Sequence, residues 1–139
     1  MSDRPDGSPT AVDVVLRPEW AAVQAKDKVF TFRWVVLAPG VGLYLLYVVP
    51  AGKTLYIVEI GEAMYAQDAA DAELNQMFSG YIYEHTTQGT LWRMGGNGGA
   101  GAVFNKPLVI PAGHQVDFGL TNQSNHHVLA DMAAGGYEV

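Results

Sequence analysis

The chain has 139 residues, a formal charge of −6 and no cysteine. One domain is the default at this length, and the negative charge argues against nucleic-acid binding, which requires a basic surface. The absence of cysteine excludes disulfides, thiolate metal ligands and cysteine nucleophiles. Only 16 % of the residues are charged whereas 49 % are hydrophobic, so the chain must bury much apolar surface in a core or against neighbouring subunits.

The N-terminal residues 1–11 are rich in Pro, Gly, Ser and Asp and contain too few apolar residues to form a core. We expect a flexible arm here, or an arm that orders against a partner, followed by a single β-sandwich domain over residues 12–139. Residues 12–16 are a candidate first strand, and Pro18 is suitably placed to begin a short helix over residues 18–24. The N-terminus lacks the apolar core of a secretion signal, and no run is long enough to span a membrane.

Most of the remaining chain alternates apolar and polar residues in short runs separated by turn residues. The alternation places Phe30, Phe32, Trp34 and Val36 on one face of a strand over residues 29–37. Residues 42–49 are apolar on both faces, which is typical of a central strand or of an interface strand. Further strands are expected over residues 54–60 with a continuation towards 65, and over residues 77–85, 90–94, 115–121 and 128–132.

Acidic residues interrupt this pattern at residues 67–75, where Asp68 is expected to cap a short helix. The spacing of turn signals is that of a β-sandwich. We therefore predict an all-β, antiparallel, jelly-roll-like β-sandwich with about eight to ten short strands and at most one or two short helices.

One phrase occurs twice: Val49-Pro50-Ala51-Gly52 before one strand and Ile110-Pro111-Ala112-Gly113 before another. Proline suits the second position of a type I turn and glycine the fourth, so each copy predicts a tight corner that leads into a strand. Cupins carry a similar corner, but their metal-binding histidines are missing here, because His114 follows Gly113 directly and no histidine precedes His85.

The sequence offers no convincing catalytic or metal-binding motif. The glycine tract over residues 95–102 is not a phosphate-binding loop, because Pro107 prevents the helix that must follow; we expect a surface loop, or a loop that orders in an assembly. His126 and His127 are adjacent and would face opposite sides of a strand. The acids Asp68, Asp71 and Glu73 lack the spacing of a calcium loop. We expect no catalytic residue, no cofactor and no metal.

Aromatic residues leave a second possibility open. Trp92, Tyr81 and Tyr83 would fill the core, anchor a protein interface or stack on sugars. The alternative to a structural role is therefore a lectin-like, carbohydrate-binding β-sandwich. A metal-free cupin-like enzyme is the weakest alternative.

Three segments, Val49–Ile57, Lys106–Gly113 and Gly136–Val139, resemble the capsid decoration (cement) proteins of tailed bacteriophages, of the small β-sandwich or jelly-roll kind. The resemblance covers residues 42–139. It implies a non-enzymatic virion protein that binds and stabilises the outer surface of an icosahedral capsid after assembly in the host cytoplasm. The implied partners are the major capsid protein and further copies of the chain, with a homotrimer favoured, and neither nucleic acid nor membrane. Candidate interface residues are Arg4, Pro5, Val12, Val14, Tyr44, Tyr47, Trp92, Arg93 and Asn97.

Overall fold

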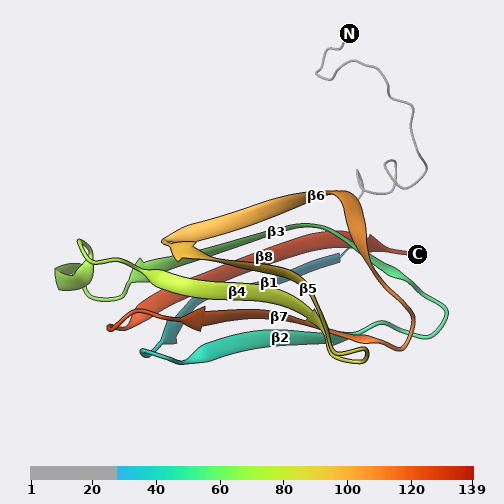
Figure 1. Ribbon diagram of the computed structural model, residues 1–139, viewed down its shortest axis with the longest axis horizontal. Coiled ribbons are helices and arrows are strands. Elements are labelled where there is room, and N and C mark those ends of the chain that lie inside the picture. The colour runs from blue at the N-terminus through green and yellow to red at the C-terminus, as the bar shows by residue number, and fades with distance from the viewer. Residues whose placement is uncertain (1–27) are drawn as a thin grey trace, which may run out of the picture.

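The computed structural model describes residues 28–139, so the arm, strand and helix expected over residues 1–24 lie outside the described residues. The described residues form eight strands and one 3-10 turn, and the all-β prediction is confirmed for them. The elements are β1 (Lys28–Leu37), β2 (Gly42–Val48), β3 (Leu55–Ala66), η1 (Ala69–Asp71), β4 (Met77–Glu84), β5 (Gly89–Asn97), β6 (Gly99–Ile110), β7 (Gln115–Asn122) and β8 (Val128–Glu138) (Figure 1).

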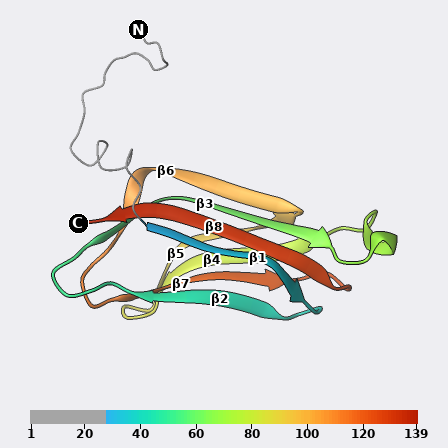
Figure 2. The ribbon, with the colours of Figure 1, turned by 180° about the vertical axis from the view of Figure 1, so that it is seen from behind.

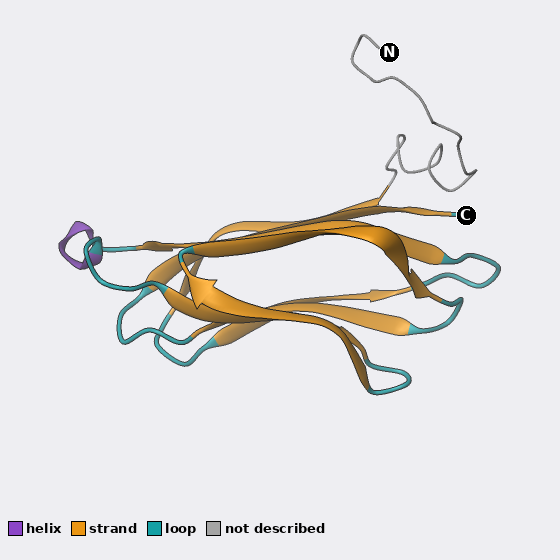
Figure 3. Cartoon of the chain, turned by 45° about the horizontal axis from the view of Figure 1, so that its top comes forward, coloured by secondary structure: helices purple, strands orange, loops and turns teal. Residues whose placement is uncertain are grey.

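Two four-stranded antiparallel sheets form the two layers of a sandwich (Figure 3). Sheet A has the order β1-β8-β3-β6 and sheet B the order β2-β7-β4-β5. Four of the pairs, β1–β8, β2–β7, β3–β6 and β4–β5, join strands whose numbers sum to nine. This is the arrangement of an eight-stranded jelly roll, in which one long hairpin is rolled across two sheets, and it confirms the predicted fold class.

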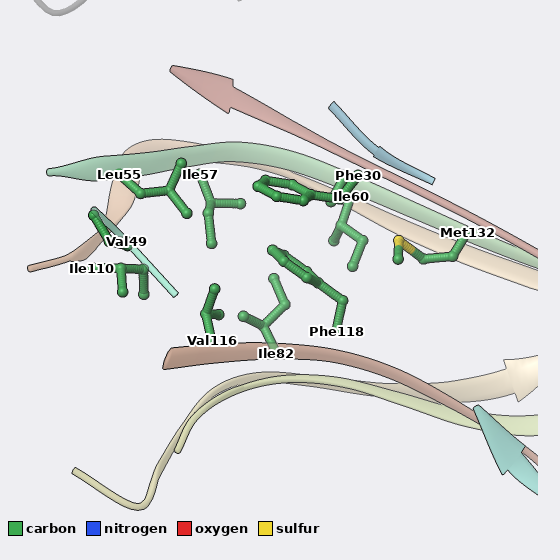
Figure 4. Packing of buried hydrophobic residues seen from close by; sticks show 11 residues of the cluster. Phe30, Val49, Leu55, Ile57, Ile60, Ile82, Ile110, Val116, Phe118 and Met132 are labelled. Atoms are coloured by element: carbon green, nitrogen blue, oxygen red, sulfur yellow. The ribbon is translucent and has the colours of Figure 1, made fainter. Parts of the chain in front are cut away.

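The core lies between the sheets and is built from alternate residues of each strand (Figure 4). Val116, Phe118 and Leu120 of β7 point inward and are fully buried, as the alternation predicts. The ring of Phe30 from sheet A stacks on Phe118 from sheet B, with centroids 4.8 Å apart. Burying one such side chain contributes roughly 1.5–3 kcal/mol, so these contacts hold the layers together. A second cluster lies towards the other end of β3 and contains Leu37, Met64, Phe78, Leu120, Val128 and Ala130.

The two Pro-Ala-Gly corners are type II turns and not the predicted type I turns. The Lys53 N–H donates to the Pro50 carbonyl, so proline is the first residue of the turn and glycine the third. Gly52 and the equivalent Gly113 have φ angles of 77° and 80°. A type II turn requires this left-handed conformation at its third position, which explains the glycine.

The two corners also lie against each other. The Val49 N–H donates to the His114 carbonyl at 3.0 Å, and the Gly113 N–H donates to the Val49 carbonyl at 2.8 Å. The repeated phrase therefore connects the β2–β3 turn to the β6–β7 turn at one end of the sandwich.

Strand β1 contains a bulge that the alternating sequence did not predict. The register to β8 shifts between Phe32 and Val35, and Trp34 adopts a φ of 56°. An extra residue in a strand exchanges the faces of all later side chains. Trp34 is consequently 56 % exposed and Val36 also faces outward, so the prediction that they share a face with Phe30 and Phe32 is wrong.

The glycine tract over residues 95–102 belongs to β5 and β6, and the loop prediction is wrong. Only Gly98, with a φ of 85°, serves as the turn between the two strands. A Cβ atom on Gly101 would lie 3.0 Å from the Ile60 carbonyl oxygen, and one on Gly95 would lie 3.1 Å from that of Phe78. Glycine is favoured at these two positions because a side chain there would crowd the backbone of the neighbouring strand.

Other local predictions are confirmed, with longer strands than expected. The strand expected over residues 128–132 continues to Glu138, and the strand from residue 54 reaches Ala66. Asp68 caps the 3-10 turn, where its carboxylate accepts a hydrogen bond from the Ala70 N–H at 3.0 Å.

Candidate functional site

Strand β2 is a free edge of sheet B and carries no charge. Among residues 28–139 it pairs with β7 alone, and Gly42–Val48 contains only Gly, Leu, Tyr and Val. The outward-facing side chains of Tyr44, Leu46 and Val48 are each more than half exposed. The central-strand alternative for this segment is therefore wrong. An uncharged apolar edge is instead a template for pairing with another chain.

The other three edge strands carry features that oppose such pairing. Strand β1 has Lys28, Arg33 and the bulge. Strand β6 has Lys106 and Pro107, and β5 has Arg93 and a register shift in its pairing with β4. Charges, prolines and bulges are the usual means by which proteins protect sheet edges. Among the edges within residues 28–139, β2 is the one without any of them.

The backbone groups at the free side of β2 can be assigned from its ladder. Val49 bonds through both its N–H and its C=O to the β6–β7 corner, at His114 and Gly113. In an antiparallel ladder every second residue bonds to the partner strand. The residues that alternate with Val49, which include Tyr44, Leu46 and Val48, therefore direct their N–H and C=O groups to the open edge.

An aromatic groove crosses the outer face of sheet B next to this edge. The groove is open to solvent and has a volume of about 420 Å³, which is in the size range of small-ligand sites. Its lining comes from all four strands of the sheet and the adjoining turn: Tyr44, Leu46, Tyr81, Tyr83, His85, Thr90, Arg93, Gln115 and Asp117.

Tyr81 is held across β7 by the absence of a side chain at Gly119. The two residues are direct cross-strand partners, and a Cβ atom on Gly119 would lie 2.2 Å from the Tyr81 Cζ atom. The glycine therefore makes room for the hydroxyl end of the ring. Burial, followed by the nearby Tyr44, raises the pKa of the Tyr81 hydroxyl, which keeps that group protonated.

The polar groups of the groove are centred on Asp117. Its Oδ1 atom accepts a hydrogen bond from Gln115 Nε2 at 3.0 Å, and its Oδ2 atom lies 3.6 Å from His85 Nδ1. Arg93 lines the same groove and forms no ion pair with a carboxylate of residues 28–139. The groove thus combines tyrosine rings with one oriented acceptor and one available cation.

The candidate interface residues fall into four groups. Tyr44 and Arg93 lie in the groove. Tyr47 and Trp92 pack against the core, and the Tyr47 hydroxyl donates to Glu138. Asn97 holds the β3–β4 connection, because its Oδ1 atom accepts from the Gln76 N–H at 2.7 Å. Arg4, Pro5, Val12 and Val14 lie outside the described residues.

The predicted group of Trp92, Tyr81 and Tyr83 is therefore divided between the two faces of sheet B. Tyr81 and Tyr83 line the groove, whereas Trp92 packs inward. The register of β5 against β4 shifts between Ile82 and Tyr83, so the side chains of β5 do not simply alternate between the two faces of the sheet. Sequence reasoning missed Asp117, although its place between the inward residues Val116 and Phe118 marks it as outward-facing.

One buried carboxyl group stands apart from the groove. Glu62 of β3 is 4 % exposed and points between the sheets, and neither of its carboxyl oxygens has a hydrogen-bond partner among the described residues. A Cβ atom on Gly80 of β4 would lie 1.6 Å from its Oε1 atom, so that glycine provides the space for the carboxyl group. Burial raises the pKa of Glu62 to about 8.

The histidines are used in separate pairs. His114 Nδ1 contacts the Glu84 carboxylate, and His126 Nε2 lies 2.6 Å from Gln76 Oε1. Within residues 28–139, no group of three or more His, Asp or Glu side chains is arranged to hold a metal ion. Over the same residues, no helix has the length and hydrophobicity needed to cross a membrane.

Comparison with known proteins does not assign the chain to a family. No protein-family model matches it, and no curated protein is significantly similar to it. The fold and the two surface features, the free β2 edge and the groove, are therefore the observations from which a function can be proposed.

Proposed function

We propose that this protein is a non-enzymatic structural protein that self-assembles through strand β2 and decorates the outer surface of a viral capsid. The observation that carries the proposal is the uncharged free edge of β2, with Tyr44, Leu46 and Val48 exposed beside it. The capsid as the surface that is decorated comes from the resemblance to phage cement proteins.

The low charge of the chain supports self-assembly. A chain with only 16 % charged residues has few groups with which to protect its apolar surface, and the protective groups it has stand on β1, β5 and β6. Pairing two copies along β2 would satisfy the outward N–H and C=O groups of both strands. It would also place the apolar side chains of the two copies next to each other on one continuous sheet.

The symmetry of the pairing determines the size of the oligomer. If β2 pairs with β2 of a second copy, the interface is twofold and the product is a dimer. The homotrimer favoured by the resemblance requires β2 to pair with a different surface of the next copy. Native mass spectrometry distinguishes these two assemblies, and a strictly monomeric protein contradicts self-assembly.

The Leu46→Pro variant tests the role of the edge. The Leu46 N–H points away from β7, so proline removes a group used for pairing and leaves the internal ladder intact. We expect its self-association to weaken by at least about tenfold. The matched control is Leu46→Ala, which removes the side chain but keeps the N–H and should still associate. Equal association of the proline variant and the wild type would contradict β2 pairing.

The capsid part of the proposal has a separate test. Tailed-phage particles whose genome carries this coding sequence should contain the chain in stoichiometric amounts, measured by quantitative mass spectrometry of purified virions. Its absence from such particles would contradict capsid decoration but would leave self-assembly through β2 unaffected.

A further inference from the structure

The groove on the outer face of sheet B has the shape and chemistry of a ligand site. Tyr44, Tyr81 and Tyr83 supply rings from β2 and β4, and the available space is about 420 Å³. Aromatic side chains offer flat apolar faces with a polar edge. Tyr81 is fixed in place over Gly119, so this part of the groove is formed before a ligand arrives.

The polar groups in the groove are placed for hydrogen bonding. The Asp117 carboxylate is oriented by Gln115 and His85 and presents acceptor oxygens. Arg93 supplies donors that no carboxylate of the described residues occupies. The hydroxyl of Tyr81 remains protonated, because burial raises its pKa. A matching ligand has apolar faces for the rings and hydroxyl groups that both donate and accept.

These requirements favour one class of ligand. An apolar protein surface placed on the groove would desolvate the exposed Arg93 and leave the remaining acceptor capacity of the largely buried Asp117 carboxylate unused, which is costly. A nucleotide would bring its phosphates near the Asp117 carboxylate. A sugar ring, in contrast, has a C–H face that stacks on tyrosine and hydroxyls that bond to both a carboxylate and a guanidinium.

We propose that the groove formed by Tyr44, Tyr81, Tyr83, Arg93 and Asp117 binds a short glycan. This binding activity goes beyond the proposed assembly function and is compatible with it. Pairing through β2 uses backbone groups at the edge of the sheet, whereas the groove is formed by side chains on its face. A β2-paired assembly would therefore carry several glycan sites on one extended surface.

NMR titration of the full-length protein with defined oligosaccharides tests this proposal. The probes are the hexamers of cellulose, chitin, mannan and amylose, together with hexagalacturonate as an acidic probe. We expect at least one of them to cause saturable chemical-shift changes at Tyr81, Tyr83 and Arg93. If none does so up to about 10 mM, where even millimolar affinity would be detected, the proposal is wrong.

Variants show whether the groove itself is the site. Tyr83→Ala should weaken binding of the responsive sugar by about tenfold or more, the loss of roughly 1.4 kcal/mol of contact energy. Tyr44→Ala provides a second test with little risk to folding, because Tyr44 is 59 % exposed. The matched control is Tyr65→Ala on the outer face of sheet A, which should bind as the wild type does. Unchanged binding by both groove variants would overturn the proposal.

The glycan result and the assembly result are independent. A monomeric protein that binds a hexasaccharide in the groove would contradict only pairing through β2. An oligomer that binds none of the probes would contradict only the glycan site.

Discussion

Each of the two long sides of the sandwich consists of two edge strands, one from each sheet, but the two sides are built differently. On one side, β5 and β6 are joined by a one-residue turn at Gly98 (Figure 1), and seven of the eight residues 95–102 around this turn are Gly or Ala. The Gly98 carbonyl accepts from the Met64 N–H at 2.8 Å, so this side is tied to the centre of sheet A. On the other side, the edge strands β1 and β2 carry large exposed apolar side chains such as Val29, Val36 and Leu46.

We call the β5–β6 side the closed side, because the Gly98 turn bonds to β3. We call the β1–β2 side the open side, because β2 has no charge, proline or bulge to protect its edge. On the closed side Gly95 and Gly101 lie close to the backbones of β4 and β3, and between the sheets Gly80 of β4 leaves the space that the Glu62 carboxyl group occupies. On the open side β1 is protected by charge and by its bulge, whereas β2 is not. In this comparison the buried Glu62 is the feature that bears on stability, and the β2 edge is the feature that bears on the proposed assembly.

The largest effect is expected from the ionisation of Glu62 on the closed side. Its pKa is about 8 in the folded protein, raised from 4.5 by burial. The folded state therefore favours the protonated carboxyl group. The contribution of Glu62 to the free energy of unfolding is complete below pH 4.5 and is lost as the pH rises to about 8. Glu62→Gln cannot ionise, so its free energy of unfolding should exceed that of the wild type by an amount that grows across this window, on the order of a few kcal/mol.

Urea denaturation of both proteins over a series of pH values measures this difference. The comparison with Glu62→Gln cancels the titration of all groups that the two proteins share. Parallel stability curves for the two proteins would show that Glu62 keeps an ordinary pKa.

A smaller effect on the closed side concerns Gly80. Gly80→Ala places a methyl group where the Glu62 carboxyl lies, 1.6 Å from Oε1, and should destabilise the wild type. In the Glu62→Ala background the methyl group has space, so the same substitution should be nearly neutral. Thermal or urea unfolding of the four proteins in this double-mutant cycle should give a coupling free energy of about 1–3 kcal/mol. Additive effects would mean that Glu62 does not occupy this space.

The smallest effect lies on the open side, at the bulge in β1. Trp34 has a φ of 56°, and its N–H donates to Asp131 Oδ1 at 2.7 Å. Glycine adopts this conformation without strain but alanine does not, and both lose the ring contact with Tyr65. We therefore expect Trp34→Gly to be more stable than Trp34→Ala by about 1 kcal/mol. Equal unfolding midpoints would indicate that the bulge relaxes when the tryptophan is removed.

The fold could be predicted because the inner faces follow simple alternation. Val116, Phe118 and Leu120 on β7, and Phe78 and Ile82 on β4, are inward in the structure as their spacing indicates. The faces of Trp34 and Val36 could not be predicted, since a bulge leaves no clear signal in the sequence. The glycine tract was predicted to be a loop because glycine favours turns. Its residues form strands because β5 lies close to β4 and β6 lies close to β3, which only the folded chain shows.

The candidate site could be predicted only in part. Tyr44, Tyr81, Tyr83 and Arg93 stand out in the sequence as aromatic and basic residues, but β2, β4 and β5 meet only in the tertiary structure. Asp117 acquires its role through Gln115 and His85, which lie on either side of it in space and not in one motif. The open edge of β2 likewise depends on strand order, because an apolar run alone also fits a central strand.

The position of β8 has a consequence for the biosynthesis of the protein. This strand lies between β1 and β3 (Figure 2). Its ladders pair Lys28 with Gly136 and Leu55 with Glu138. A ribosome releases β1 and β3 long before β8, so sheet A cannot form its centre until β8 has emerged. Contacts of such large sequence separation fold slowly, and the nascent chain exposes apolar strands meanwhile. Sheet A can therefore be completed only after β8 has left the ribosome, because the last strand to be made takes a central position in this sheet.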